Sequence, residues 1–213
     1  MLISILAPLF KLYGRKYLNR VIYLASKKLK GIDYTITNIV ASSNLGLELD
    51  LFLIATKIPE VEYEPEQFPG AILKYDDPKA TILLFKNGKI VCVGCKSEAK
   101  IAETIAKTVK LLTPYAKRIL KKTKRPEFEI TNIVASANLG MGLDLYTIAS
   151  EVENVEYEPE QFPGAILKFR EPKASLLLFK NGKVICAGSR DEKSIEAALV
   201  KAKRLLKPFS TVK

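Results

Sequence analysis

The chain has 213 residues, of which 48% are hydrophobic, and it carries a formal net charge of +11. A chain of this length and composition can bury one large core or two cores of about a hundred residues each. It contains no histidine, which excludes an imidazole base and a histidine-ligated zinc ion. Its three cysteines, an odd number without a secretion-type framework, favour a reducing cytosol.

The positive charge is concentrated at the N-terminus. Residues 1–31 hold seven basic and no acidic residues, so the remainder carries 27 (34 − 7) basic residues against 23 acidic ones. A mildly basic body of this kind is compatible with a polyanionic partner but does not establish one.

The first ten residues, MLISILAPLF, form an apolar run that Pro8 interrupts. A membrane span needs about twenty apolar residues, and a signal peptide places its basic residues before the apolar run rather than after it. Residues 9–30 could form a basic amphipathic helix on a membrane or nucleic-acid surface. The segment could equally be a dispensable extension, or result from a start site placed too far upstream. We treat residues 1–31 as a basic extension of uncertain role and expect no membrane partner.

An internal repeat organises the rest of the chain. A shift of 94 residues aligns residues 33–114 with 127–208 without a gap, and about 47 of the 82 aligned positions are identical. The segment EYEPEQFPGAILK at 62–74 returns unchanged at 156–168. A period this long, present only twice, indicates a duplicated half-domain rather than a solenoid. We expect one repeat at 32–125 and a second at 126–213, with the basic segment 117–127 as a short linker.

Each repeat has the pattern of an α+β unit built on an antiparallel sheet. The Asn-Gly pair at 87–88 is typical of a tight hairpin, and apolar residues with helical spacing follow Ser97. In the first repeat we expect helices at 47–57 and from Ser97 onward, a loop at 65–70, and strands at 35–42, 62–64, 71–75, 80–85 and 90–94.

Both faces of the expected sheet are largely apolar. In the strand at 80–85, Ile82 and Leu84 share one face while Thr81, Leu83 and Phe85 share the other. Two helices per repeat can cover only one of these faces. The second face must then be covered by the other repeat or another subunit, as in a sandwich, or by an external partner, because monomeric proteins rarely expose such a patch.

The motifs TNIVAS, YEPEQFPG and LLFKNGK, together with the gapless duplication, resemble the TATA-box-binding protein family in its compact, archaeal-like form. The resemblance covers essentially all of residues 32–210. It implies a saddle of about ten antiparallel strands with four helices on its convex face. It further implies a general transcription initiation factor that binds A·T-rich promoter DNA and recruits transcription factor B and the RNA polymerase pre-initiation complex. The family is itself a standard example of minor-groove kinking.

The resemblance assigns DNA-intercalating roles to two pairs of phenylalanines, Phe68 with Phe85 and Phe162 with Phe179. An aromatic wedge suits this role because ring stacking replaces the base stacking that a kink removes.

The resemblance places Asn38 and Asn132 at the centre of the saddle. A side-chain amide can donate to the acceptors that A·T pairs offer in the minor groove, where G·C pairs add an amino group. Apolar neighbours leave no room for that amine, so the combination selects A·T-rich DNA. The other implied base contacts are Val40, Val134, Ile72, Ile166, Leu83, Leu177, Thr81, Ser175, Val91 and Ile185.

Charged residues complete the implied site. The resemblance assigns phosphate contacts, which set affinity and its salt dependence, to Lys74, Lys168, Lys89 and Lys183. It assigns binding of transcription factor B to the acidic loop of the second repeat, with Glu158, Glu160 and Gln161 as the contacts. The family usually has a bulkier apolar residue where Gln161 stands.

The symmetry of the repeats generates a further hypothesis. On the proposed DNA face the repeats are expected to differ only at Thr81/Ser175, Val91/Ile185 and Val93/Ala187. The saddle would then have little polarity of its own, and its partner would set its orientation on a promoter.

An enzyme is not expected, and neither is a cofactor or metal. The motif CVGC at 92–95 has the spacing of metal ligands, but its counterpart is CAGS and Cys92 is expected in the core. The competing hypothesis is a paralogous saddle that acts as a protein-interaction or accessory nucleic-acid-binding module, similar to half-domains attached to some DNA glycosylases and type-2 ribonucleases. The intact phenylalanine pairs and central asparagines favour promoter binding. A promoter-binding protein is expected in the cytoplasm, associated with the nucleoid. Without DNA, the concave face could support weak self-association.

Overall fold

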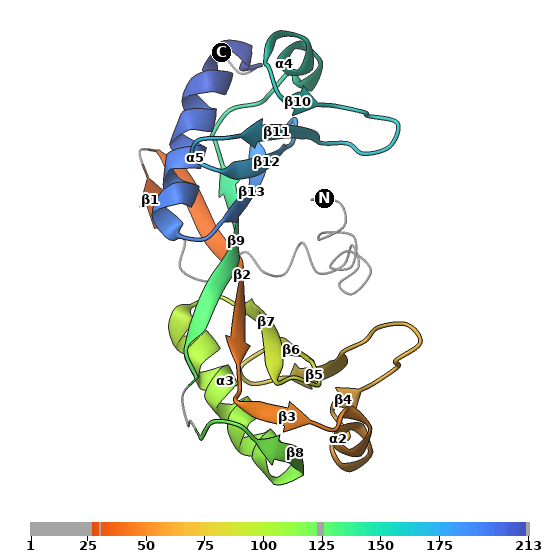
Figure 1. Ribbon diagram of the computed structural model, residues 1–213. Coiled ribbons are helices and arrows are strands. Elements are labelled where there is room, and N and C mark those ends of the chain that lie inside the picture. Colours follow the sequence, from red (N-terminus) through yellow and green to blue (C-terminus); the bar gives the residue numbers. More distant parts are fainter. Residues whose placement is uncertain (1–26, 30, 123–125, 212–213) are drawn as a thin grey trace.

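The computed structural model describes residues 27–29, 31–122 and 126–211. They form two similar lobes that share one arched antiparallel sheet (Figure 1). The first lobe contains β2 (Ile32–Asn44), α2 (Leu51–Lys57), β4 (Val61–Glu62), β5 (Ala71–Tyr75), β6 (Ala80–Leu84), β7 (Lys89–Cys95) and α3 (Glu98–Leu112). The second lobe contains β9 (Phe128–Asn138), α4 (Leu145–Glu151), β10 (Val155–Glu156), β11 (Ala165–Phe169), β12 (Ala174–Leu178), β13 (Lys183–Ser189) and α5 (Glu192–Leu206).

The two longest strands of the described chain, β2 and β9, join the lobes. They pair antiparallel through the middle of the sheet, with Ile39 opposite Ile133. Ten strands follow one another in the order β10-β11-β12-β13-β9-β2-β7-β6-β5-β4, and the short strand β1 (Lys27–Leu29) adds to β2. The predicted α+β saddle of about ten strands and four helices is confirmed for the described residues.

The core lies on one side of this sheet. Ile82 and Leu84 are completely buried, whereas Leu83 between them is partly exposed. The helices α3 and α5 begin directly after the capping residues Ser97 and Asp191, and each buries one apolar face. Figure 1 shows both helices on the outer side of the arch, while the loops before β5 and β11 point to the inner side.

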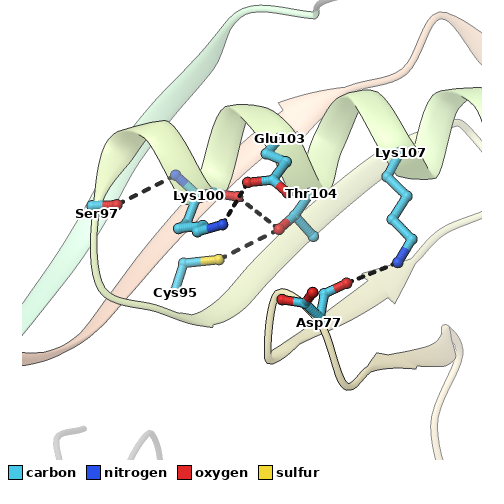
Figure 2. Close-up of polar contacts among 7 residues, drawn as sticks. All are labelled: Asp77, Cys95, Ser97, Lys100, Glu103, Thr104 and Lys107. Atoms are coloured by element: carbon cyan, nitrogen blue, oxygen red, sulfur yellow. Dashed lines mark hydrogen bonds and ion pairs between the residues drawn. The ribbon is translucent and has the colours of Figure 1, made fainter.

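A lysine of each long helix contacts the neighbouring hairpin, β5–β6 or β11–β12. Lys107 of α3 donates to the carbonyl of Asp77 at 2.9 Å, and its ammonium lies 4.6 Å from the centre of the Tyr75 ring. Figure 2 shows this contact beside the Ser97 cap and the Thr104 hydroxyl, which donates to the carbonyl of Lys100. The second repeat has the same arrangement, in which Lys201 contacts the carbonyl of Glu171 and the ring of Phe169.

The bounds of two predicted segments are wrong in the first repeat. The predicted helix at 47–57 begins only at Leu51, after the capping residue Asp50, because Leu47–Leu49 form the strand β3. This strand pairs with β8 (Ala116–Ile119), so the predicted linker at 117–127 begins as part of a two-stranded sheet. Leu49 of β3 and Ala116 of β8 lie opposite each other although they are 67 residues (116 − 49) apart in sequence, and a local pattern does not reveal such a pairing.

The N-terminal extension is described only at its end, and residues 1–26 and 30 lie outside the described residues. The helix considered for residues 9–30 is wrong at Lys27–Leu29, which form β1 against β2. Lys27 also pairs with Glu192 of α5, with 2.5 Å between its ammonium nitrogen and the carboxylate oxygen.

Tyr34 ties β2 to α5 in a way that the other repeat lacks. Its side chain is 1% exposed, and its hydroxyl lies 2.8 Å from a carboxylate oxygen of Glu192 and 2.5 Å from one of Glu196. Burial, followed by these carboxylates, raises the pKa of Tyr34. The hydroxyl therefore stays protonated and donates to one carboxylate at a time. Phe128 holds the equivalent position in the second repeat.

Replacing Tyr34 by Phe should destabilise the protein. A hydrogen bond to a charged group contributes about 1.5–3 kcal/mol to stability. Water can replace part of this contribution at the half-exposed carboxylates, so we expect the free energy of unfolding, measured with urea, to fall by about 1–2 kcal/mol. Tyr115→Phe, at a half-buried ring, is the control and should change stability by less than about 0.5 kcal/mol. An unchanged midpoint for Tyr34→Phe would show that this contact contributes nothing.

Candidate nucleic-acid interface

The strand register defines the residues of the open face, by which we mean the sheet face opposite α3 and α5. Residues directly opposite each other on neighbouring strands share a face, so the pairing traces rows of side chains across each lobe. One row of the first lobe contains Glu62, Ile72, Leu83, Val91 and Ser42. The matching row of the second lobe contains Glu156, Ile166, Leu177, Ile185 and Ser136.

A second row brings the predicted polar positions to the same face. In the second lobe it runs through Lys168, Ser175, Ala187, Val134 and Asn38. In the first lobe Lys74, Thr81 and Val93 occupy the matching positions, and Val40 lies opposite Asn132. The register therefore gathers every predicted base-contact residue on the open face. Thr81 and Val134 are the most buried of them, each 9% exposed.

The predicted phenylalanine pairs lie at the two outer parts of this face. The ring centres of Phe68 and Phe85 are 5.9 Å apart, and those of Phe162 and Phe179 are 6.1 Å apart, in edge-to-face geometry. All four rings are half-buried. Each pair joins one ring from the loop before β5 or β11 to one ring at the end of β6 or β12.

A glycine sets the position of each ring pair. A Cβ atom at Gly70 would lie 2.7 Å from the Phe68 ring, 2.9 Å from the Leu84 carbonyl and 3.1 Å from the Phe85 ring, and Gly164 has the same surroundings. These distances leave no room for a side chain. The loop backbone also turns tightly, because the amides of Gln67 and Phe68 both donate to the Glu64 carbonyl. The rings are thus held by the backbone itself.

The central asparagines have a defined orientation. The side-chain oxygen of Asn38 accepts from the Gly94 amide at 2.7 Å, and that of Asn132 accepts from the Gly188 amide at 2.8 Å. These glycines have φ of +102° and +98°, next to register shifts in the sheet, which is the conformation of a β-bulge that favours glycine. Because the oxygens are engaged, the amide nitrogens remain as donors for an external acceptor.

Two of the predicted phosphate-contacting lysines already have partners. The ammonium of Lys74 lies 2.7 Å from the carboxylate of Glu62, and that of Lys168 lies 2.5 Å from Glu156. Both lysine side chains are about half exposed, and exposed ion pairs are weak, so a phosphate can replace the carboxylate. Sequence reasoning missed these pairs, although the spacing of 12 residues occurs in both repeats. Lys89 and Lys183 are exposed at the starts of β7 and β13.

The predicted partner-binding residues lie on the projecting loop of the second repeat. Glu158, Glu160 and Gln161 are all exposed, and Figure 1 shows this loop, between β10 and β11, extending away from the sheet. The Gln161 amide donates to the Glu158 carboxylate, and the backbone amides of Gln161 and Phe162 donate to the Glu158 carbonyl. The acidic groups are therefore presented by an ordered turn.

The cysteines lie in the core. Cys92, Cys95 and Cys186 are buried and free, and Cys92 is completely buried as predicted. The sulfur atoms of Cys92 and Cys95 are 3.7 Å apart, and Figure 2 shows the contact from Cys95 to the Thr104 hydroxyl. Hydrogen bonds from Cys92 and then Thr104 lower the pKa of the Cys95 thiol. Within the described residues, no three His, Cys, Asp or Glu side chains form a metal-binding group.

The predicted near-symmetry of the open face is wrong at one position. Glu129 lies opposite Ser42, whereas its counterpart Thr35 lies opposite Ser136. Both belong to this face because their sequence neighbours, such as Phe128 and Tyr34, pack against the core. Sequence alignment alone missed the difference because β9 begins alongside the end of β2 in the first lobe, away from the rest of its own repeat.

Among the helices of the described chain, none has the length and apolar character to span a membrane.

Comparison with known proteins agrees with this architecture. Residues 33–115 and 127–209 each match the family described as "Transcription factor TFIID (or TATA-binding protein, TBP)". The chain is 43% identical over 183 residues to the TATA-box-binding protein of Pyrobaculum calidifontis, covering 86% of this chain and 90% of that protein. It is 44% identical over 181 residues to the TATA-box-binding protein of Thermoplasma volcanium, covering 84% and 96%.

A solved structure shows the same fold. The structure named Methanococcus jannaschii TBP superposes with a TM-score of 0.74 at 38% identity, covering 82% of this chain and 98% of that one. Both repeats thus match the family description, and each of the two relatives matches more than four fifths of the chain. The chain belongs to the TATA-box-binding protein family.

Proposed function

We propose that this protein is a general transcription initiation factor that binds a TATA element through the minor groove and bends it. The observation that carries the proposal is the open face, which has a phenylalanine pair at each outer part and two outward donor amides at its centre. Acceptors are all that an A·T pair offers in the minor groove, and the free amide nitrogens of Asn38 and Asn132 are matched to them.

The apolar rows explain both the bend and the selectivity. The minor groove of B-DNA is about 6 Å wide, too narrow for a sheet, so binding requires the groove to open. Wedging rings between base pairs costs a few kcal/mol per unstacked step, and burial of residues such as Ile72, Leu83 and Val91 offsets this cost. The same residues provide no acceptor for a guanine amine, so a G·C pair would leave that amine unpaired.

When DNA binds, two lysines exchange a carboxylate partner for a phosphate of the DNA backbone. Lys74 and Lys168 leave Glu62 and Glu156 and contact the DNA backbone, while Lys89 and Lys183 add two further contacts. Each phosphate that is neutralised releases counterions, so affinity falls as salt rises. The acidic partners also limit attraction to DNA that the face cannot fit, since a contact from Lys74 or Lys168 must first break an ion pair.

The wedge mechanism is tested by energy transfer across a short TATA duplex labelled at both ends. The wild type should bend the A·T-rich duplex sharply and leave a G·C duplex straight. Phe162→Ala/Phe179→Ala should abolish the bend and weaken binding at least about tenfold, because the lost stacking is no longer replaced. Phe52→Ala, at a 62%-exposed ring on α2, is the matched control and should bend DNA normally.

Two results would contradict the wedge. A bend that survives the double substitution would remove the phenylalanines from the mechanism. A wild type that never bends TATA DNA but still binds transcription factor B would identify the fold as a protein-interaction platform instead.

The recruitment of transcription factor B and then of RNA polymerase is the second part of the proposal. Glu158, Glu160 and Gln161 carry it, because a carboxylate-rich loop would be repelled by phosphates and suits a basic protein surface. The role is non-enzymatic and needs no cofactor, in keeping with relatives that are named for DNA binding. Promoter binding places the protein in the cytoplasm with the nucleoid.

Charge-reversal variants distinguish the role of the acidic loop in the second repeat from that of the identical loop in the first. Glu158→Lys/Glu160→Lys should weaken the complex with transcription factor B on TATA DNA at least about tenfold, because like charges then meet across the interface. The bend by the protein alone should persist. The matched control is Glu64→Lys/Glu66→Lys in the identical loop of the first repeat, which should retain the complex. Equal losses from both variants, in a gel-shift titration, would refute a specific role for the second loop.

A further inference from the structure

The open face carries one charged position without a counterpart in the other lobe. The carboxylate of Glu129 continues the row formed by Val91 and Ser42, whereas the matching row through Ile185 and Ser136 ends at the hydroxyl of Thr35. The other acids of these rows, Glu62 and Glu156, occur in both lobes. Glu129 therefore breaks the two-fold symmetry of the surface proposed to meet DNA.

This carboxylate lies beside the proposed base-contacting residues. Glu129 lines the same hollow as Phe85, Lys89 and Val91, and its side chain is 67% exposed. Its ion-pair partner Arg190 lies at 2.8 Å and is 68% exposed. Such an exposed pair is weak, so the carboxylate remains available to a ligand that enters the hollow.

A carboxylate in this place distinguishes the two kinds of base pair. An A·T pair presents only acceptors in the minor groove, which repel a carboxylate, whereas a G·C pair presents the N2 amino group of guanine as a donor. Thr35 has no charge, and its hydroxyl can donate or accept. The first lobe should therefore accommodate a G·C pair better than the second lobe does, because a carboxylate accepts from the guanine amine more strongly than a hydroxyl.

We propose that Glu129 gives the saddle an intrinsic polarity on DNA, so that the protein alone places the first lobe over the half of an element that contains a G·C pair. This inference rests on the proposed minor-groove binding. It replaces the expectation that orientation comes from the partner alone.

The test uses a symmetric A·T-rich element in which one G·C pair is placed in one half. The duplex carries a donor dye at the G·C-containing end. The protein carries an acceptor dye on Glu151→Cys, an exposed residue at the end of α4 in the second lobe, while its own cysteines are buried. Single-molecule energy transfer then separates the two orientations by their distance.

Four proteins are compared on this duplex. For the wild type, the orientation with the first lobe over the G·C pair should exceed the other at least about fivefold, as expected for one base-specific contact. Glu129→Thr and Thr35→Glu each make the lobes alike at this position and should bring the ratio close to one. The exchanged variant, Glu129→Thr/Thr35→Glu, should reverse the preference.

The outcomes distinguish this inference from the proposed function. If all four proteins bend the symmetric element but share one orientation ratio, Glu129 does not set polarity and the inference is wrong. If the wild type fails to bend the symmetric element, the proposed function itself fails. Reversal by the exchanged variant, with unchanged bending, supports the inference in a way that a loss of folding cannot imitate.

Discussion

The antiparallel pairing of β2 with β9 is the contact on which the rest of the molecule depends. It turns two half-domains into one sheet and makes the helix-free side continuous from one projecting loop to the other. It also places Asn38 opposite Val134 and Asn132 opposite Val40, so the two donor amides meet at the middle of the face. A duplicated fold without this pairing would leave two small apolar patches with no common axis.

The open face is a compromise between stability and binding. Its side chains alternate with core residues, so each strand contributes to burial on one side while the other side stays partly exposed. No second layer of secondary structure packs on the open face of the described chain, and contacts with glycine backbones fix the side chains there instead. Gly70 and Gly164 hold the ring pairs, and Gly94 and Gly188 orient the asparagines. The face is thereby shaped before DNA arrives, which reduces the ordering that binding requires.

Local patterns predicted most of the fold but not its long-range contacts. Duplication, alternation at 80–85 and the helical spacing of apolar residues after Ser97 identified the lobes, the strands and the long helices. The same patterns could not reveal that Leu47–Leu49 pair with a segment counted as linker, since strand partners are not encoded by spacing. The predicted base-contact residues lie on the expected face, but the ion pairs of Lys74 and Lys168 and the position of Glu129 depend on register across strands. Gly94 within a strand was a signal for the bulge that could have been used.

The central claim is that this face recognises its DNA from the minor groove, and inosine provides the most direct test. An I·C pair has the major-groove edge of G·C but lacks the N2 amino group, so its minor groove matches that of A·T. The affinity for a TATA duplex with every A·T pair replaced by I·C should be measured beside the A·T and G·C duplexes. Affinity within a few-fold of the A·T duplex, with the G·C duplex bound far more weakly, is the predicted result. An I·C duplex bound as weakly as the G·C duplex would contradict recognition through the minor groove.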